Sequence, residues 1–147
     1  MHSGRDYIHM KLNYYAIGVG AGVDLGGSMF FGTLFYVSFA ILANTQAANL
    51  QELYQIVFQS PVFLGVSFLI GATFNIVGGY LSAKIADQAY LTYGALSAIP
   101  CIILGAFELA NPLGSIFPVW LLILGKISAL VFGIYGGWLC KKHLTSN

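Results

Sequence analysis

Four stretches of the sequence are long and apolar enough to cross a lipid bilayer as α-helices. They cover residues 15–43, 62–83, 91–107 and 119–140. A helix needs about 20 apolar residues to span the hydrocarbon core, where every backbone polar group has to be paired internally. Only 7% of all residues are charged, against roughly 25% in soluble domains. We therefore predict an all-α, polytopic membrane protein in which residues 1–147 form one domain, a bundle of four transmembrane helices.

The connection between the first two spans is polar, yet it holds apolar residues at helical spacing. Leu53, Tyr54, Val57 and Phe58 recur three to four residues apart among glutamines and asparagines. This pattern is typical of a short amphipathic helix that lies on a membrane surface. We predict such an interfacial helix within residues 46–59.

Positively charged residues are distributed unevenly between the two sides of the predicted bundle. The loops 44–60 and 108–118, which share one side, contain no Lys or Arg. Five of the six positively charged residues flank the spans on the other side: Arg5, Lys11, Lys84, Lys141 and Lys142. Such residues favour the cytoplasmic side. The bias predicts a multi-pass protein of a bacterial-type inner (plasma) membrane, with both termini in the cytoplasm.

The second and fourth spans end in similar sequences. Residues 78–84 read Gly-Gly-Tyr-Leu-Ser-Ala-Lys, and residues 136–142 read Gly-Gly-Trp-Leu-Cys-Lys-Lys. Two tandem helical hairpins in parallel orientation would produce this pattern. The alternative is that aromatic and Lys residues are simply common at the cytoplasmic ends of transmembrane helices. That alternative leaves the paired glycines unexplained.

Small residues recur four apart in three of the spans. In lipid, helices associate by close packing rather than by the hydrophobic effect, and glycine permits the closest approach. The candidate helix-packing residues are Gly18, Gly22, Gly26, Gly71, Gly79, Gly125, Gly133 and Gly137. They could pack the helices of one chain together, or they could face a second copy in a homo-oligomer or a larger membrane complex.

Four polar residues lie at or near membrane depth: Asp24, Asn75, Glu108 and Lys126. Ionisable groups are costly in a bilayer, so each is a functional candidate. At a rise of about 1.5 Å per residue, Asp24 and Lys126 should differ in depth by roughly 18 Å, which argues against a pair between them. Lys126 is expected to pair with Glu108 or to extend toward the headgroups.

Asp24 has two interpretations. It could cap the N-terminus of a helix that begins there, which we favour from sequence alone. It could instead bind a proton or a cation in a cavity shared with Asn75.

These features favour a small membrane protein that acts through helix assembly, as an accessory subunit or a self-associating scaffold. The alternative is a small oligomeric transporter or channel for an ion or solute. If Asp24 and Lys126 face a hydrated cavity inside the bundle, transport is favoured. We expect no catalysis, cofactor or metal, because no catalytic or metal-binding arrangement of residues is recognisable. A net charge of +1 gives no basic field for nucleic acid.

Overall fold

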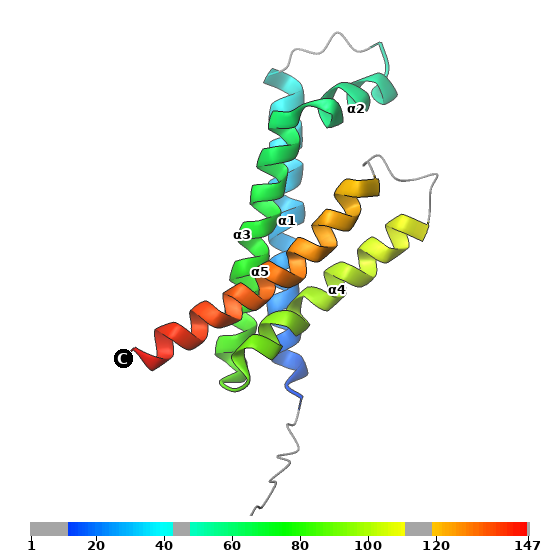
Figure 1. Cartoon of the computed structure of the whole chain (residues 1–147). Helices are drawn as coiled ribbons and strands as arrows, with labels where there is room; N and C mark the ends of the chain where they lie inside the picture. The colour runs from blue at the N-terminus through cyan, green and yellow to red at the C-terminus, as the bar shows by residue number, and fades with distance from the viewer. Residues whose placement is uncertain (1–11, 43–47, 111–118, 147) are drawn as a thin grey trace, which may run out of the picture.

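The computed structural model describes residues 12–42, 48–110 and 119–146, which form helices and no strands. The helices are α1 (Tyr14–Leu42), α2 (Leu50–Gln59), α3 (Pro61–Ala86), α4 (Tyr90–Ala110) and α5 (Val119–Thr145) (Figure 1). All except α2 are long and apolar enough to cross a membrane. The predicted all-α fold with four spans is therefore confirmed. The short helix α2 falls within the segment predicted to form an amphipathic helix.

The beginning of α1 is set by Asn13. Its side-chain Oδ1 accepts a hydrogen bond from the backbone N–H of Ala16 at 3.1 Å, and its own N–H donates to the hydroxyl of Tyr93 at 2.8 Å. This is the usual arrangement of an N-cap residue, here tied to a second helix. Asp24 consequently lies in the interior of α1, and the interpretation of Asp24 as a helix cap is wrong.

The helices are arranged around α3, which contacts each of the other four. Figure 1 shows α1 and α3 side by side, with α4 and α5 inclined to them. The two pairs meet near the end where α1 begins and α5 finishes, which we call the terminal end. They diverge toward the opposite end, where α2 lies across the bundle and which we call the α2 end. Within the described ranges, the backbones of α1 and α5 do not approach one another closely.

Glycines bring the backbones together toward the terminal end. A Cβ atom on Gly20 would lie 2.6 Å from the carbonyl oxygen of Gly78, so α1 and α3 touch there. The carbonyl oxygen of Gly133 in α5 is pressed against both Gly79 of α3 and Gly94 of α4. We call these last three residues the glycine junction. Only glycine permits such approach, since any side chain would overlap backbone atoms.

The glycines predicted to pack helices divide into two groups. Gly79, Gly133 and Gly137 make close contacts with neighbouring helices. The other five would each have open space around an added Cβ: Gly18, Gly22, Gly26, Gly71 and Gly125. For these five the interpretation as packing residues within one chain is wrong. A spacing of four identifies a face of small residues, but not which face turns toward the bundle. In α1 the bundle contacts are made by Gly20 and Gly27 instead.

The two glycine pairs of the suspected repeat have related but not identical surroundings. Gly78 approaches α1 and Gly79 approaches α5, whereas Gly136 approaches α3 and Gly137 approaches α4. Each pair thus joins its helix to one neighbour in its own hairpin and one in the other hairpin, in opposite order. The sequence similarity therefore corresponds to a shared packing requirement, and a duplicated hairpin stays a prediction.

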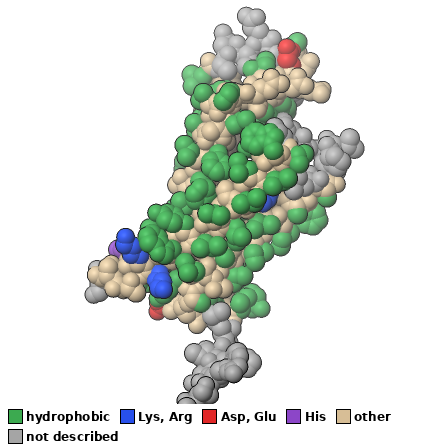
Figure 2. All heavy atoms as spheres, viewed as in Figure 1, with side chains coloured by type: hydrophobic (Ala, Val, Ile, Leu, Met, Phe, Trp, Pro, Cys, Tyr) green, Lys and Arg blue, Asp and Glu red, His purple; other side chains and the backbone are tan. Residues whose placement is uncertain are grey.

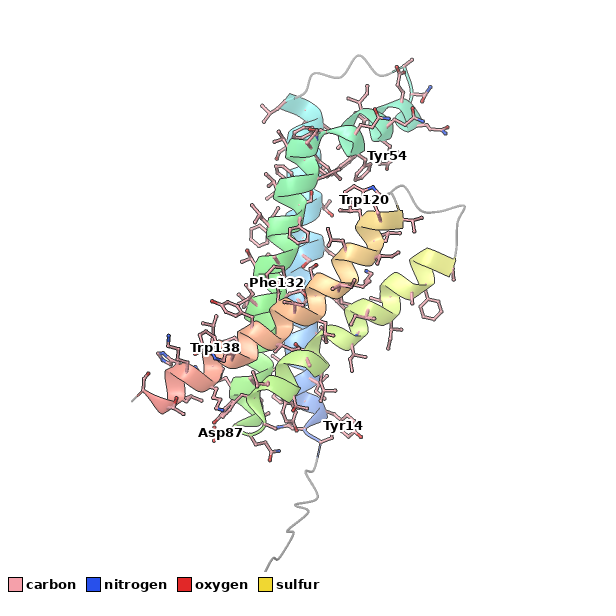
Figure 3. The ribbon with its side chains drawn as sticks, in the orientation of Figure 1. Tyr14, Tyr54, Asp87, Trp120, Phe132 and Trp138 are labelled. Atoms are coloured by element: carbon pink, nitrogen blue, oxygen red, sulfur yellow. The ribbon has the colours of Figure 1, made fainter. Side chains whose placement is uncertain are left out.

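Aromatic rings fix α2 to the bundle. Phe63 at the start of α3 is nearly completely buried, with its ring centroid 5.2 Å from that of Phe58 in α2. Tyr36 of α1 stacks on Tyr54 and Phe58 at 5.8 and 6.0 Å. In Figure 3 Tyr54 and Trp120 lie toward the α2 end, while Tyr14 and Trp138 lie toward the terminal end. Aromatic residues at both ends of the spans fit the two interfaces of a bilayer.

The surface of the molecule matches this description. Hydrophobic side chains cover most of the visible length of the long helices, and charged side chains gather mainly toward the ends (Figure 2). A soluble protein would not expose such a surface, because contiguous apolar area of this extent drives aggregation in water. Lipid is the solvent that suits it.

Candidate functional site

A cavity of about 320 Å³ lies among the four long helices. Its polar lining residues are Asp24, Ser28, Ser67, Asn75, Lys126 and Ser128. Leucines, Phe68, Met29 and Cys101 supply much of the remaining wall. This volume lies at the lower end of the range typical of small-molecule sites, which are mainly apolar with a few oriented polar groups.

Asp24 reaches the cavity from α1 and is almost completely buried, with 3% of its surface exposed. It faces α3, since a Cβ on Gly78 would lie 3.1 Å from the Cβ of Asp24. The hydroxyl of Ser28, one turn further along α1, donates to Oδ1 of Asp24 at 3.5 Å. A carboxylate in such a position is expensive to keep in a membrane protein unless it meets water, a ligand or an opposite charge.

Asn75 lines the same cavity from α3 and is 8% exposed. Its Nδ2 donates to the backbone carbonyl of Gly71 at 2.7 Å. Its Oδ1 is buried and has no hydrogen-bond partner in the described structure. Since buried polar atoms are almost always paired, this oxygen needs a donor from water or from a ligand. The predicted sharing of a cavity by Asp24 and Asn75 agrees with this geometry.

Lys126 lines the cavity from α5 and is close enough to Asp24 for an electrostatic interaction. The outer part of its side chain lies against Gly105 of α4, where a Cβ would overlap Cε and Nζ. Residue counting gave the two residues a difference in depth of roughly 18 Å, yet both line one cavity. Their relative depth in a membrane stays a prediction. Counting residues gives depth only for helices parallel to the membrane normal, and α5 is inclined to α1 (Figure 1).

The predicted pair of Lys126 with Glu108 involves a side chain that lies outside the described residues. The backbone of α4 continues through Glu108, three residues beyond Gly105. Lys126 thus lies against the helix on which its expected partner is located, and the pairing itself stays a prediction.

A second cavity of about 280 Å³ extends from the first toward the α2 end. The two share Ser28, Ser67 and Gly71, and the second is bordered by Tyr36 and by Phe58 of α2. Together they form a groove between α1 and α3 that runs from Asp24 to the aromatic rings beneath α2. We call this the α1–α3 groove.

Sequence reasoning missed Ser67 and Cys101 as lining residues and did not single out Ser28 as a partner of Asp24. The sequence contained part of the pattern that could have identified the serines. Asp24 and Ser28 are four residues apart, as are Ser67, Gly71 and Asn75. Both sets therefore form polar stripes on single helix faces. Cys101 is one residue of an apolar stretch, and nothing in the sequence distinguishes it.

Among the described residues, no group of three or more His, Cys, Asp or Glu side chains could hold a metal ion. Comparison of the chain with protein-family models, with curated proteins and with solved structures finds no significant match. Function therefore has to be inferred from the geometry of the cavity.

Proposed function

We propose that this protein carries a small solute across the membrane through the cavity that contains Asp24, Asn75 and Lys126. The observation that supports it is that Asp24 and Lys126, both within spanning helices, line one cavity. Groups of this kind inside a bilayer normally mark a substrate or ion path. Sequence alone favoured assembly over transport because of the glycine stripes, the few ionisable groups and the small soluble parts.

We further propose that the terminal end faces the cytoplasm and that the α2 end faces outward in a bacterial-type inner membrane. Among the described residues, Lys84, Lys141 and Lys142 lie toward the terminal end, and this bias supports the orientation. The α1–α3 groove then leads outward, while the glycine junction closes the cytoplasmic side. The arrangement corresponds to an outward-facing state of a carrier, and transport requires a second state in which the junction opens.

The two native cysteines allow access to the cavity to be tested without introducing another cysteine. Cys101 lines the cavity and is partly exposed, whereas Cys140 is completely buried. We expect a charged, membrane-impermeant methanethiosulfonate to modify Cys101 when it is added from outside to the Cys140→Ser variant. The matched Cys101→Ser variant, with Cys140 alone, should stay unmodified. The reaction is measured by mass spectrometry of the protein after purification.

Transport adds a second requirement. In inside-out vesicles Cys101 should also react, more slowly, because a carrier exposes its site to each side in turn. Reaction from the outside only would limit the cavity to binding and refute transport. Failure of Cys101 to react from either side would refute a hydrated cavity altogether.

Assembly of several copies is a second candidate, favoured by one observation on α1. Gly18, Gly22 and Gly26 form an exposed line, and a Cβ added to any of them would meet no neighbouring atom of its own chain within 4 Å. Such a line is the kind of surface on which a second transmembrane helix packs closely. Assembly and transport are compatible, since small carriers can work as oligomers.

The substitution Gly22→Leu tests whether the exposed glycines of α1 contact a second copy or only pack helices within one chain. If α1 contacts a second copy, the substitution should convert an oligomer to a monomer without unfolding it, because the added side chain meets open space in its own chain. Mass measurement in mild detergent reads the outcome. A wild-type protein that is monomeric at working concentration, or a Gly22→Leu oligomer of unchanged mass, would exclude this surface.

A further inference from the structure

The polar atoms on the α1–α3 side of the cavity are mainly hydrogen-bond acceptors. Asp24 contributes a carboxylate whose only described hydrogen bond is the long one from Ser28. Asn75 contributes Oδ1, because its Nδ2 is already bound to the Gly71 carbonyl. Both residues are more than nine-tenths buried and line the same cavity. A ligand with N–H donors and a positive charge would satisfy both acceptors.

The surroundings of these two acceptors are apolar. Leu25, Met29, Phe68 and Leu122 line the cavity around the polar groups. Lys126 approaches from the opposite side, with the end of its side chain against Gly105. The carboxylate and the lysine ammonium therefore belong to different walls. A ligand with one charged end and an apolar body would match this distribution.

We propose that the cavity binds a primary ammonium group attached to an apolar body, with the ammonium held by Asp24 and by Oδ1 of Asn75. This inference rests on the proposed function, since it names the substrate class of the same cavity. A primary ammonium has three N–H donors, enough for both acceptors together with the Ser28 hydroxyl oxygen. Its hydrogen bonds to a carboxylate are charge-assisted and among the strongest available.

Other ligand classes fit less well. A divalent cation such as Ca²⁺ is usually bound by several carboxylates, and Asp24 is the one carboxylate among the described lining residues. An anion would suit Lys126, but it would meet the Asp24 carboxylate and would leave Oδ1 of Asn75 without a donor. A quaternary ammonium has no N–H donor and would leave Oδ1 of Asn75 unpaired. The ammonium itself could belong to a free amphiphilic amine or to the headgroup of an aminophospholipid.

The test uses 2-phenylethylammonium as the probe and phosphatidylcholine nanodiscs as the membrane, because choline headgroups have no N–H donors. Calorimetric titration measures binding directly. The second readout is the rate at which Cys101 is modified in the Cys140→Ser variant. We expect saturable binding that slows the modification of Cys101, and much weaker effects from the neutral analogue 2-phenylethanol.

Three variants locate the ammonium. Asp24→Asn keeps the size of the side chain but removes its charge, and it should weaken binding by about tenfold or more. Asn75→Leu removes the second acceptor and should weaken binding by a smaller factor. Asp87→Asn is the matched control, since Asp87 ends α3 at the terminal end, away from the cavity (Figure 3). It should bind the probe as the wild type does.

Changing the lipid composition of the nanodiscs distinguishes the two sources of the ammonium. If an aminophospholipid is the occupant, adding phosphatidylethanolamine to the nanodiscs should raise the apparent dissociation constant of the probe. An unchanged constant assigns the site to a free amine. Either result supports an ammonium site.

The inference is overturned if 2-phenylethanol binds as tightly as the ammonium, if the calorimeter detects no binding, or if Asp24→Asn binds normally. These results leave the proposed function standing as long as Cys101 reacts with the charged reagent from both sides. If Cys101 is unreactive but the ammonium binds normally, the ammonium site stands and the proposed transport path is refuted.

Discussion

Replacing Gly133 by Leu should strongly destabilise the packing of α5 against α3 and α4. The Gly133 carbonyl is pressed against Gly79 and Gly94 at the same time, so three helices meet at this residue. A leucine side chain there would run into the α4 backbone at Gly94 and the side chain of Ala98. Overpacking of a core costs about 1–3 kcal/mol where side chains can move aside. Backbones held in helices cannot move aside in this way. We therefore expect the unfolding free energy to fall by more than about 3 kcal/mol.

The buried thiol of Cys140 reports this loss. In a Cys101→Ser background, a thiol-reactive fluorophore should react with Cys140 only on unfolding, since this side chain is fully buried at the terminal end. The melting temperature of Gly133→Leu should fall sharply, or the protein should be reactive from the outset. Gly22→Leu is the matched control and should melt within a few degrees of the parent. Equal melting of the two variants would show that the glycine junction does not hold the bundle together.

Replacing Phe63 by Ala should detach α2 from the bundle. Phe63 is 3% exposed, and its ring lies 5.4 Å from those of both Phe35 and Phe39 in α1. Its contact with Phe58 joins α2 to α3 at the same point. Removing a buried aromatic ring usually costs about 3–5 kcal/mol through lost burial and the cavity left behind. Because Phe63 lies between Phe58 of α2 and the rings of α1, much of the effect should fall on α2.

Hydrogen exchange measured by mass spectrometry can separate local from global effects. Backbone amides of α2 should exchange much faster in Phe63→Ala, while those of α5 change less. Phe107→Ala provides the matched control, since this phenylalanine of α4 is 69% exposed and should face lipid. It should leave exchange in α2 unchanged. Normal protection of α2 in Phe63→Ala would mean that the aromatic contacts do not anchor it.

Much of the fold was predictable because it depends on local sequence. The lengths of the apolar stretches set four spans, and the spacing of Leu53, Tyr54, Val57 and Phe58 indicated the short helix between the first two. Span boundaries agree with the helices to within a few residues, except at α5, where the helix continues to Thr145. Lys141 and Lys142 extend it because charged residues form helices readily beyond the membrane.

The candidate site was predictable in its residues but not in its geometry. Asp24, Asn75 and Lys126 stand out because polar groups are rare in such apolar stretches, and all three line one cavity. Their convergence depends on the inclination of α5 relative to α1, which no sequence pattern specifies. The same inclination allows the two residues to line one cavity although their counted depths differ by roughly 18 Å.

The sequence by itself determined four helices that are long and apolar enough to span a membrane. Apolar segments of this length with few charges suit lipid as their solvent, and a backbone in lipid has to pair its polar groups internally. The sequence also identified the small and polar residues on which packing and function depend. Only the tertiary structure decided which glycines touch and which face outward, and whether the charged groups line one cavity. Those outcomes depend on how each helix is rotated and inclined, which is set by contacts between helices far apart in the chain.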